Sequence, residues 1–400
     1  MNYSVDEVIQ YIEEEDVKFI RLSFCDVLGH QKNIAIMPRV MKKAFEFGIA
    51  IDASAITGFG SEVHSDLLLH PDPSTLCCLP WRPDTGRVVR MFCTIARPDG
   101  TVFESDTRSL LIKAAEEAEK AGVSIEFGSE LEFYLFETDE KGNPTKIPYD
   151  NAGYMDIAPE DKGENVRREI CLTLDQMDIE PESSHHEEGP GQNEIDFMYS
   201  SALSAADNAI TFQSVVRAIA ARNGLTADFS PKPIKGKPGS GFHINISVNH
   251  KSRRELLNHI IAGIMDKIRE ITLFLNPVEA SYERFGSNKA PKYITWSEEN
   301  RSQLIRIPAT PEDAVRAELR SPDPMANPYV AFTLLIYAGL YGIKEALPLP
   351  DSTDINLFTA PEEELKKFSR LPGTLAEARE IARNSSFVRE HLPEGVINAY

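Results

Sequence analysis

The stretch from residue 184 to residue 197 constrains this chain more than any other, because it sets acids and imidazoles around a tight turn. Its sequence is Ser-His-His-Glu-Glu-Gly-Pro-Gly-Gln-Asn-Glu-Ile-Asp-Phe. Gly-Pro-Gly predicts a chain reversal. The alternation that follows predicts a strand with Glu194 and Asp196 on one face. Glu187 and Glu194 can then converge on one point. Two interpretations are open: a site for a hard cation, or an acidic hairpin in water.

The overall composition excludes several classes of protein. The chain has 400 residues, 42% of them hydrophobic, and a formal net charge of −20. This charge disfavours a nucleic-acid surface, which needs clustered lysine and arginine. Five cysteines without a Cys-x-x-Cys pair indicate neither a disulfide framework nor a zinc site. The N-terminus lacks the pattern of a signal peptide, and no apolar run is long enough for a bilayer. We expect a cytoplasmic protein that has no nucleic-acid or membrane partner.

The pattern of caps, strands and helices predicts two domains. A capping box at Ser4 predicts a helix to about residue 14, and strands follow at 19–24, 33–37 and 88–95. Residues 1–103 therefore form a small β-rich domain. A helix over 106–120, capped by Ser105 and Gly122, opens a second domain over 104–400. In it, strands alternate with helices near 162–178, 203–223, 253–274 and 325–346. Two short helices are expected in the tail.

Four strand-like segments alternate polar and apolar residues. One face of these segments carries acids and a histidine, and the opposite face is apolar. Adjacent carboxylates on one face of a sheet repel each other unless a cation lies between them. Five glutamates and one imidazole would make two sites of three ligands each, a set that suits Mg²⁺ or Mn²⁺ better than zinc. These residues are Glu130, Glu132, Glu187, Glu194, His243 and Glu318.

Arginines gather in the downstream part of this acidic chain, at positions 284, 301, 306, 316 and 320. Arginine recognises carboxylate and phosphate groups through its planar fork. Metal carboxylates that face several arginines indicate phosphoryl chemistry, although ordinary surface ion pairs are the alternative. The glycine-rich run at 235–241 leads into a strand and is not a P-loop. Its glycines would let the backbone approach a small ligand closely.

Over nearly the whole chain these motifs resemble the glutamine synthetase family, type I. The resemblance is carried, in order, by residues 52–59, 129–132, 186–194, 239–243, 300–302, 306–308 and 318–323. It implies an α+β fold, with a β-grasp N-terminal domain (1–103) and a catalytic domain (104–400) whose curved antiparallel sheet is backed by helices. It also implies a homo-oligomer, a double-ringed dodecamer with sites at subunit interfaces, and a ligase of nitrogen metabolism that uses ATP and two to three Mg²⁺ or Mn²⁺ ions.

The resemblance also implies roles for individual residues. Glu132, Glu187 and Glu194 would hold one metal ion, and Glu130, His243 and Glu318 the other. Arg284 and Arg320 would bind the acid substrate beside Gly239 and Gly241. Arg301 and Arg306 would contact phosphate, with Ser247 and Arg316 near the nucleotide. Asp52 would act with Arg301 and Arg320 in catalysis, in the site of the neighbouring subunit.

Two departures from the family pattern leave the amine substrate open. Lys289 stands where the family's flap carries a glutamate, and Pro238 replaces an asparagine. A lysine at ~4 Å would repel an ammonium ion by roughly 1–4 kcal/mol. Three hypotheses follow: a glutamate–ammonia ligase, a ligase that joins glutamate or a related acid to another primary amine, and a non-catalytic binding protein. The intact ligand set disfavours the third hypothesis.

Overall fold

The N-terminal part of the chain folds around a six-stranded sheet. In the computed structural model, which describes residues 3–400 except 62, 83–84, 251 and 312–313, the strand order is β2-β1-β6-β4-β3, with β5 on β6. The β1–β6 pair is parallel and the other pairs are antiparallel. The strands are β1 (Val17–Cys25), β2 (Gln31–Ile36), β3 (Ile49–Asp52), β4 (Asp66–Pro71), β5 (Cys77–Cys78) and β6 (Arg87–Ala96).

The predicted helix starts are nearly all correct. Helix α1 (Val5–Glu14) begins with the expected capping box, in which Ser4 and Glu7 each bond the other's backbone N–H. Helix α2 (Met41–Phe47) follows β2. Helix α3 (Thr107–Lys120) is capped by Asp106, so the prediction of Ser105 as the cap was wrong. The Asp106 carboxylate accepts the Arg108 N–H at 3.2 Å, and its second oxygen accepts the Ile95 N–H at 3.0 Å.

The second sheet has ten strands in the order β14-β15-β16-β13-β7-β10-β9. It is antiparallel except for the β14–β15 pair. The long strand β7 (Ile125–Thr138) is its spine, with β13 and β12 along one edge and β11, β10 and β8 along the other. The remaining strands are β8 (Pro144–Pro148), β9 (Pro181–His186), β10 (Gln192–Phe197), β11 (Ser200–Ser201), β12 (Leu225–Asp228), β13 (Phe242–Val248), β14 (Trp296–Glu298), β15 (Ile305–Ile307) and β16 (Ala317–Leu319).

The helices of this second part lie close to their predicted positions. They are α4 (Glu164–Asp175), α5 (Ala202–Arg222), α6 (Arg253–Leu275), α7 (Glu279–Tyr282), α8 (Pro328–Lys344), α9 (Glu362–Leu365), α10 (Leu375–Asn384), α11 (Ser386–His391) and α12 (Glu394–Ala399). The described tail holds four short helices where two were expected, because Ser385 ends α10 and caps α11 within one polar run. None of the described helices combines the length and apolar character of a bilayer span.

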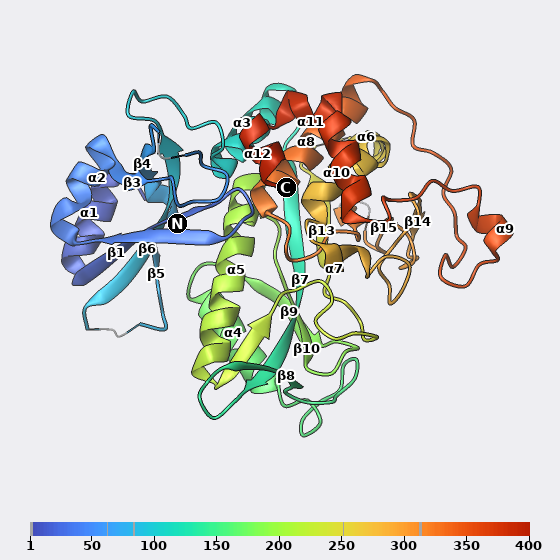
Figure 1. The fold of residues 1–400 in the computed structure, drawn as a ribbon, viewed down its shortest axis with the longest axis horizontal. Coiled ribbons are helices and arrows are strands. Elements are labelled where there is room, and N and C mark those ends of the chain that lie inside the picture. Colours follow the sequence, from blue (N-terminus) through green and yellow to red (C-terminus); the bar gives the residue numbers. More distant parts are fainter. Residues whose placement is uncertain (1–2, 62, 83–84, 251, 312–313) are drawn as a thin grey trace.

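The apolar back of the second sheet is covered by helices (Figure 1), which leaves its polar front open. Leu131 and Phe133 are fully buried, and Phe127 stacks on Phe332 of α8 with ring centroids 4.2 Å apart. Helix α8 also crosses α6 closely. A Cβ on Gly342 would lie 2.0 Å from a backbone carbonyl oxygen of α6, so only glycine fits this contact. The helices therefore hold the sheet rigid from behind.

A buried ion-pair network joins the two parts of the chain. Arg108 Nη2 lies 2.8 Å from Asp72 of the first part and 2.9 Å from Asp207 of α5. The Tyr329 hydroxyl donates to Asp207 at 2.6 Å. Breaking one partner of a buried pair leaves an uncompensated charge, which is costly. This network therefore fixes the N-terminal sheet against the helices that back the second sheet.

We expect Arg108→Met to lower the free energy of unfolding by about 3–5 kcal/mol, because Asp207 would then lose its buried cation. Arg97→Met is the matched control, since Arg97 pairs with Glu104 at the surface, and should cost less than about 1 kcal/mol. Urea unfolding followed by circular dichroism measures both. Equal losses in the two variants would contradict the role of this network.

Candidate active site

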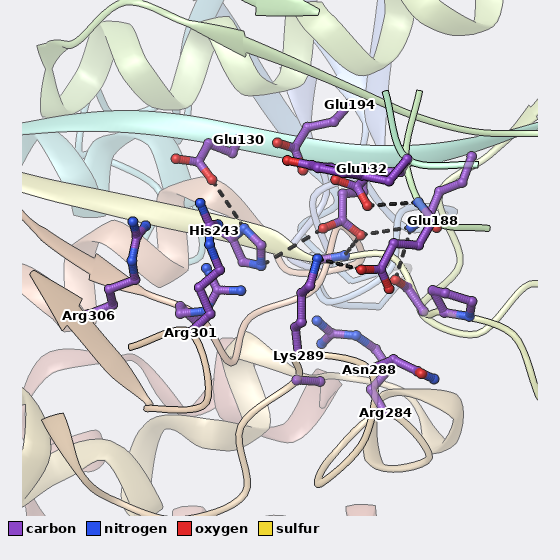
Figure 2. A pocket seen from close by; sticks show the side chains of 18 of the residues that line it. Glu130, Glu132, Glu188, Glu194, His243, Arg284, Asn288, Lys289, Arg301 and Arg306 are labelled. Atoms are coloured by element: carbon purple, nitrogen blue, oxygen red, sulfur yellow. Dashed lines mark hydrogen bonds and ion pairs between the residues drawn. The ribbon is translucent and has the colours of Figure 1, made fainter. Parts of the chain in front are cut away.

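A cavity of about 360 Å³ opens over the polar front of the second sheet. In Figure 2 the labelled glutamates project from one side, and Arg284, Arg301, Arg306 and Lys289 face them from the other. The predicted site residues that line it are Glu130, Glu132, Glu187, Glu194, Gly239, Gly241, His243, Arg284, Arg301, Arg306, Arg316 and Arg320. Acids and arginines thus meet across a single space.

One ligand cluster forms where β7, β13 and β16 run side by side. Glu130 lies directly opposite His243 in the strand register, and Nδ1 of His243 lies 3.1 Å from Oε2 of Glu130. Glu318 completes the group, with Oε1 at 3.6 Å from the same nitrogen. Ligand atoms of these three residues lie within 4.8 Å of one another. The structure therefore brings together one of the two predicted ligand sets, Glu130, His243 and Glu318.

The second cluster forms between β7 and β10. Glu132 and Glu194 are directly opposite each other in the antiparallel register, an arrangement that is unfavourable for like charges. Glu194 shares one group with Glu132 and His243, and another with His185 and Glu187. The predicted set of Glu132, Glu187 and Glu194 is thus assembled around Glu194. His185, which faces the same space, was not included in that prediction.

Burial and mutual repulsion change the acidity of these carboxyl groups. Burial, followed by the charge of Glu132, raises the pKa of Glu187 to about 7 and that of Glu194 well above its usual range. Burial and Glu130 raise the pKa of Asp196 to about 7. Burial opposes ionisation of Glu130 too, but hydrogen bonds from His243 and Asn245 outweigh it and lower its pKa to about 2. Without a cation, Glu187, Glu194 and Asp196 therefore favour the protonated form, whereas Glu130 favours the ionised form.

A buried network supports the turn that carries Glu187. His186 is bonded at both ring nitrogens: Nδ1 lies 2.7 Å from the Glu187 carbonyl oxygen, and Nε2 lies 2.9 Å from Asp150. Asp150 also accepts the Gly191 N–H at 2.9 Å. As expected for adjacent strand residues, only one histidine of the pair faces the cavity. His186 positions the turn, while His185 lies at the cavity wall.

Arginines from three segments provide the cationic side. Arg306 Nη1 bonds Glu318 at 2.7 Å, and Arg320 contacts the other oxygen of the same carboxylate. Arg284 is 3% exposed and donates to the Ser321 carbonyl oxygen at 3.0 Å. Among the residues that the structure describes, none forms a hydrogen bond with the buried Nε atoms of these three arginines. Rigid, partly unsatisfied guanidinium groups of this kind are prepared to bind carboxylate or phosphate oxygens.

Two glycines allow the backbone to reach this space. A Cβ on Gly239 would lie 2.4 Å from the Pro231 carbonyl oxygen, and one on Gly241 would lie 2.7 Å from the His243 ring. The Gly241 N–H also donates to Oε2 of Glu132 at 2.9 Å. Neither position has room for a side chain, and the expected close approach of a small ligand to this backbone stays a prediction.

Family models match almost the whole chain. One described as "Glutamine synthetase, catalytic domain" matches residues 104–400, and one described as "Glutamine synthetase, beta-Grasp domain" matches residues 16–98. The chain belongs to the glutamine synthetase family. The glutamine synthetase of Clostridium saccharobutylicum is 41% identical to it, over all of this chain and 93% of that protein. The glutamine synthetase of Methanosarcina mazei is 43% identical, over 99% of this chain and 92% of that protein.

Solved structures show the same fold. A GmaS/ADP complex superposes with a TM-score of 0.88 at 26% identity, covering 98% of this chain and 93% of that one. A Plasmodium falciparum glutamine synthetase gives a TM-score of 0.86 at 21% identity, covering all of this chain and 94% of that one. The predicted family and α+β architecture, with a β-grasp domain and a helix-backed sheet, are therefore confirmed.

Three predicted residues of this glutamine synthetase family member lie outside the described cavity lining. Glu318 is buried beside it, held by two arginines. Ser247 lies four residues beyond His243 on the same face of β13. Asp52 ends β3 in the N-terminal sheet, where it accepts the Ser54 N–H at 2.9 Å. The roles of Ser247 and Asp52 stay predictions.

Several residues that shape the site were missed by sequence reasoning. Gln192 donates to Glu132 at 2.9 Å, and Tyr154 lines the cavity from an irregular loop. Glu188 pairs with Lys289 at 2.6 Å. Gln192 begins β10, so strand alternation could have placed it on the face of Glu194. No periodic pattern signals Tyr154, and nothing local links residues 188 and 289.

The donor set fits divalent cations. Carboxylate oxygens with one imidazole are the ligands that Mg²⁺ and Mn²⁺ accept. Glu132 and Glu194 are directly opposed, and burial together with neighbouring carboxylates raises the pKa of Glu187 and of Glu194, so a cation placed between these groups would relieve their repulsion. Family membership supports the use of ATP and a divalent metal.

The repulsion in this site predicts an unusual pH dependence. The pKa of Glu187 rises from 4.5 to about 7 on folding, so the folded state holds a proton that the unfolded state releases between these values. Stability of the metal-free protein should therefore fall as the pH rises through this window. Glu187→Gln removes the charge. At pH above about 7 it should raise the free energy of unfolding by about 1–3 kcal/mol.

The measurement is urea unfolding at several pH values in the presence of a chelator. Added Mg²⁺ should stabilise the wild type more than Glu187→Gln, since bound metal favours the folded state by mass action. Identical pH profiles for the two proteins would show that burial and the neighbouring carboxylates do not raise the pKa of Glu187 in the folded state.

Proposed function

We propose that this family member is an ATP-dependent ligase that joins glutamate to ammonia through an acyl-phosphate. The observation that carries the proposal is the cavity lined by five of the predicted acidic and imidazole ligands and by five arginines, with the sixth ligand, Glu318, buried beside it. Such a pairing suits transfer of a phosphoryl group to a carboxylate. Identity of about 40% to glutamine synthetases over the full chain supports the same reaction.

The reaction has two steps. A γ-carboxylate oxygen of glutamate attacks the terminal phosphorus of ATP, and ADP leaves. The amine nitrogen then attacks the acyl carbon, phosphate leaves, and the nitrogen loses a proton. Arg284 and Arg320 orient the acid substrate, and Arg301 and Arg306 neutralise charge on the transferring group, while Ser247 and Arg316 lie toward the nucleotide. The clusters at Glu130 and Glu194 would hold two to three Mg²⁺ or Mn²⁺ ions, which would supply charge neutralisation at the phosphate oxygens.

A second reaction is favoured by one observation, the presence of Lys289 in the cavity wall where an acid was expected. In this alternative, the same acyl-phosphate is attacked by another primary amine, or forms on a related acid. Pro238, which lines the cavity beside Gly239, supports a change at the acid substrate.

We further propose that the working form is a homo-oligomer whose sites lie at subunit interfaces. Asp52 is exposed at the end of β3 and lies outside the described cavity lining of its own chain. It would reach the site of a neighbouring subunit. The free thiols of Cys25, Cys77, Cys78, Cys93 and Cys171 support a cytoplasmic location.

A phosphate-release panel tests these proposals. The protein is incubated with ATP, Mg²⁺, glutamate and either ammonium or one of several primary amines, and the product is identified by mass. Turnover with ammonium supports the first reaction. Turnover only with an organic amine supports the second. If no combination releases phosphate, the chain is a non-catalytic binding protein.

Substitutions separate the two steps. Glu130→Ala and Glu318→Ala should lower phosphoryl transfer at least ~100-fold, since each removes a metal ligand. Lys289→Ala should leave formation of the acyl-phosphate within about threefold of the wild type, because its charge is partly exposed and is paired with Glu188, which is outside the predicted metal-ligand sets. Trapping the intermediate in single-turnover experiments measures this step. Equal losses in all three variants would contradict the assigned roles.

A further inference from the structure

Lys289 forms an ion pair with Glu188 in the wall of the cavity. Its Nζ lies 2.6 Å from Oε1 of Glu188 and 5.0 Å from the centre of the Tyr154 ring. Figure 2 shows the lysine extending across the cavity to this carboxylate. The contact joins the β9–β10 turn to the segment after Arg284, two regions about a hundred residues apart in the chain. The carboxylate opposite the lysine is therefore supplied by a different segment.

The backbone at Lys289 is strained in a way that its side-chain contacts can offset. Asn288 and Lys289 have φ values of +47° and +64°, in the left-handed region that disfavours residues with a Cβ. They are the central residues of a tight turn closed by the Ala290 N–H donating to Ser287 O at 3.0 Å. Glycine would adopt this turn more easily. A lysine in this backbone conformation indicates that its side chain has a functional role.

The ion pair changes the net charge of the cavity wall beside Lys289, where we place the entry of the amine. Lys289 unpaired would add a positive charge beside the reaction space and repel a cationic amine. Paired with Glu188, it forms a neutral unit. The repulsion of a cationic amine is then removed. The two side chains are 39% and 38% exposed, so added salt can reach and screen them.

We propose that Glu188 and Lys289 act together as a specificity-determining pair, in which Glu188 masks the lysine charge so that a cationic amine can approach the acyl group. The inference rests on the proposed ligase function and extends it to the choice of amine. It assigns to Glu188 a role in admitting the amine, distinct from metal binding by its neighbour Glu187.

The test compares a charged and an uncharged nucleophile. Ammonium is a cation at neutral pH and attacks the acyl-phosphate only after it has lost a proton, whereas hydroxylamine is neutral and attacks directly. Glu188→Gln leaves the lysine unmasked and should raise KM for ammonium about tenfold, equivalent to about 1.4 kcal/mol. KM for hydroxylamine should stay within about twofold. If the panel identifies an alkylammonium as substrate, that cation replaces ammonium in the assay.

Two further variants separate masking from a general loss of structure. Glu188→Gln combined with Lys289→Met removes both charges and should return KM for the cation to within about threefold of the wild type. Glu180→Gln changes an exposed acid just before β9, at the end of the hairpin away from Glu188; it is the control for net charge and should leave both KM values unchanged. The defect of Glu188→Gln should shrink as salt is added.

The outcomes distinguish this inference from the proposed function. A wild type that makes no amide with any amine refutes the ligase and the inference with it. A wild type that turns over, with Glu188→Gln either unchanged or equally impaired for both nucleophiles, refutes the pair alone. A rise in KM that is confined to the cationic amine, and that is reversed in the double variant, supports the proposed pair.

Discussion

The structure depends on carboxylates that the β-sheet forces into proximity. Glu132 on β7 and Glu194 on β10 occupy directly opposite positions in an antiparallel register, and Glu130 faces His243 in the same way on the other edge. A sheet cannot relax this repulsion by sliding one residue, because that shift would turn every apolar back residue to the front. Burial of the back, by residues such as Phe133, therefore holds the acids together.

The same constraint explains where the cations lie. Glu318 is buried on β16 and its two oxygens are taken by Arg306 and Arg320. A buried carboxylate needs such partners, and the partners in turn need anions. The Arg284 guanidinium donates to the Ser321 carbonyl oxygen, and the carboxylate of Asp323 lies farther away, at 3.9 Å. Guanidinium groups held by the fold but incompletely satisfied make the cavity a receptor for further oxygens, which is the requirement for binding a carboxylate and phosphates side by side.

Local patterns predicted those parts of the site that strands control. Alternation alone placed Glu130 and Glu132 on one face and His243 on the same front, because strand geometry has a fixed period of two. The capping box at Ser4 and the long helices were equally local. The cap of α3 was assigned one residue early, since Asp106 competes with Ser105 and its carboxylate also bonds Ile95, a tertiary contact that the sequence does not display.

Parts of the site that depend on loops could not be predicted from the sequence. Tyr154 belongs to an irregular segment, and the turn at Lys289 meets Glu188 only after folding. Sequence comparison with a family pattern showed a lysine in place of an acid, and taken alone this implied repulsion of ammonium. The structure shows that the charge is balanced from another strand turn. A substitution that reverses a charge is therefore interpretable only together with the residue that faces it in space.

The two ends of the cavity also differ in how firmly they are built. At one end, residues beside β16 such as Glu318 and Arg320 are about 1% exposed and lie on or beside sheet strands. The amine end, as we propose it beside the β9–β10 turn, has a partly exposed ion pair between two turns. Exposed pairs contribute little to stability, whereas buried ones are costly to break. Changes at the amine end are thus tolerated by the fold, and we expect substrate choice to vary there while phosphoryl transfer is preserved.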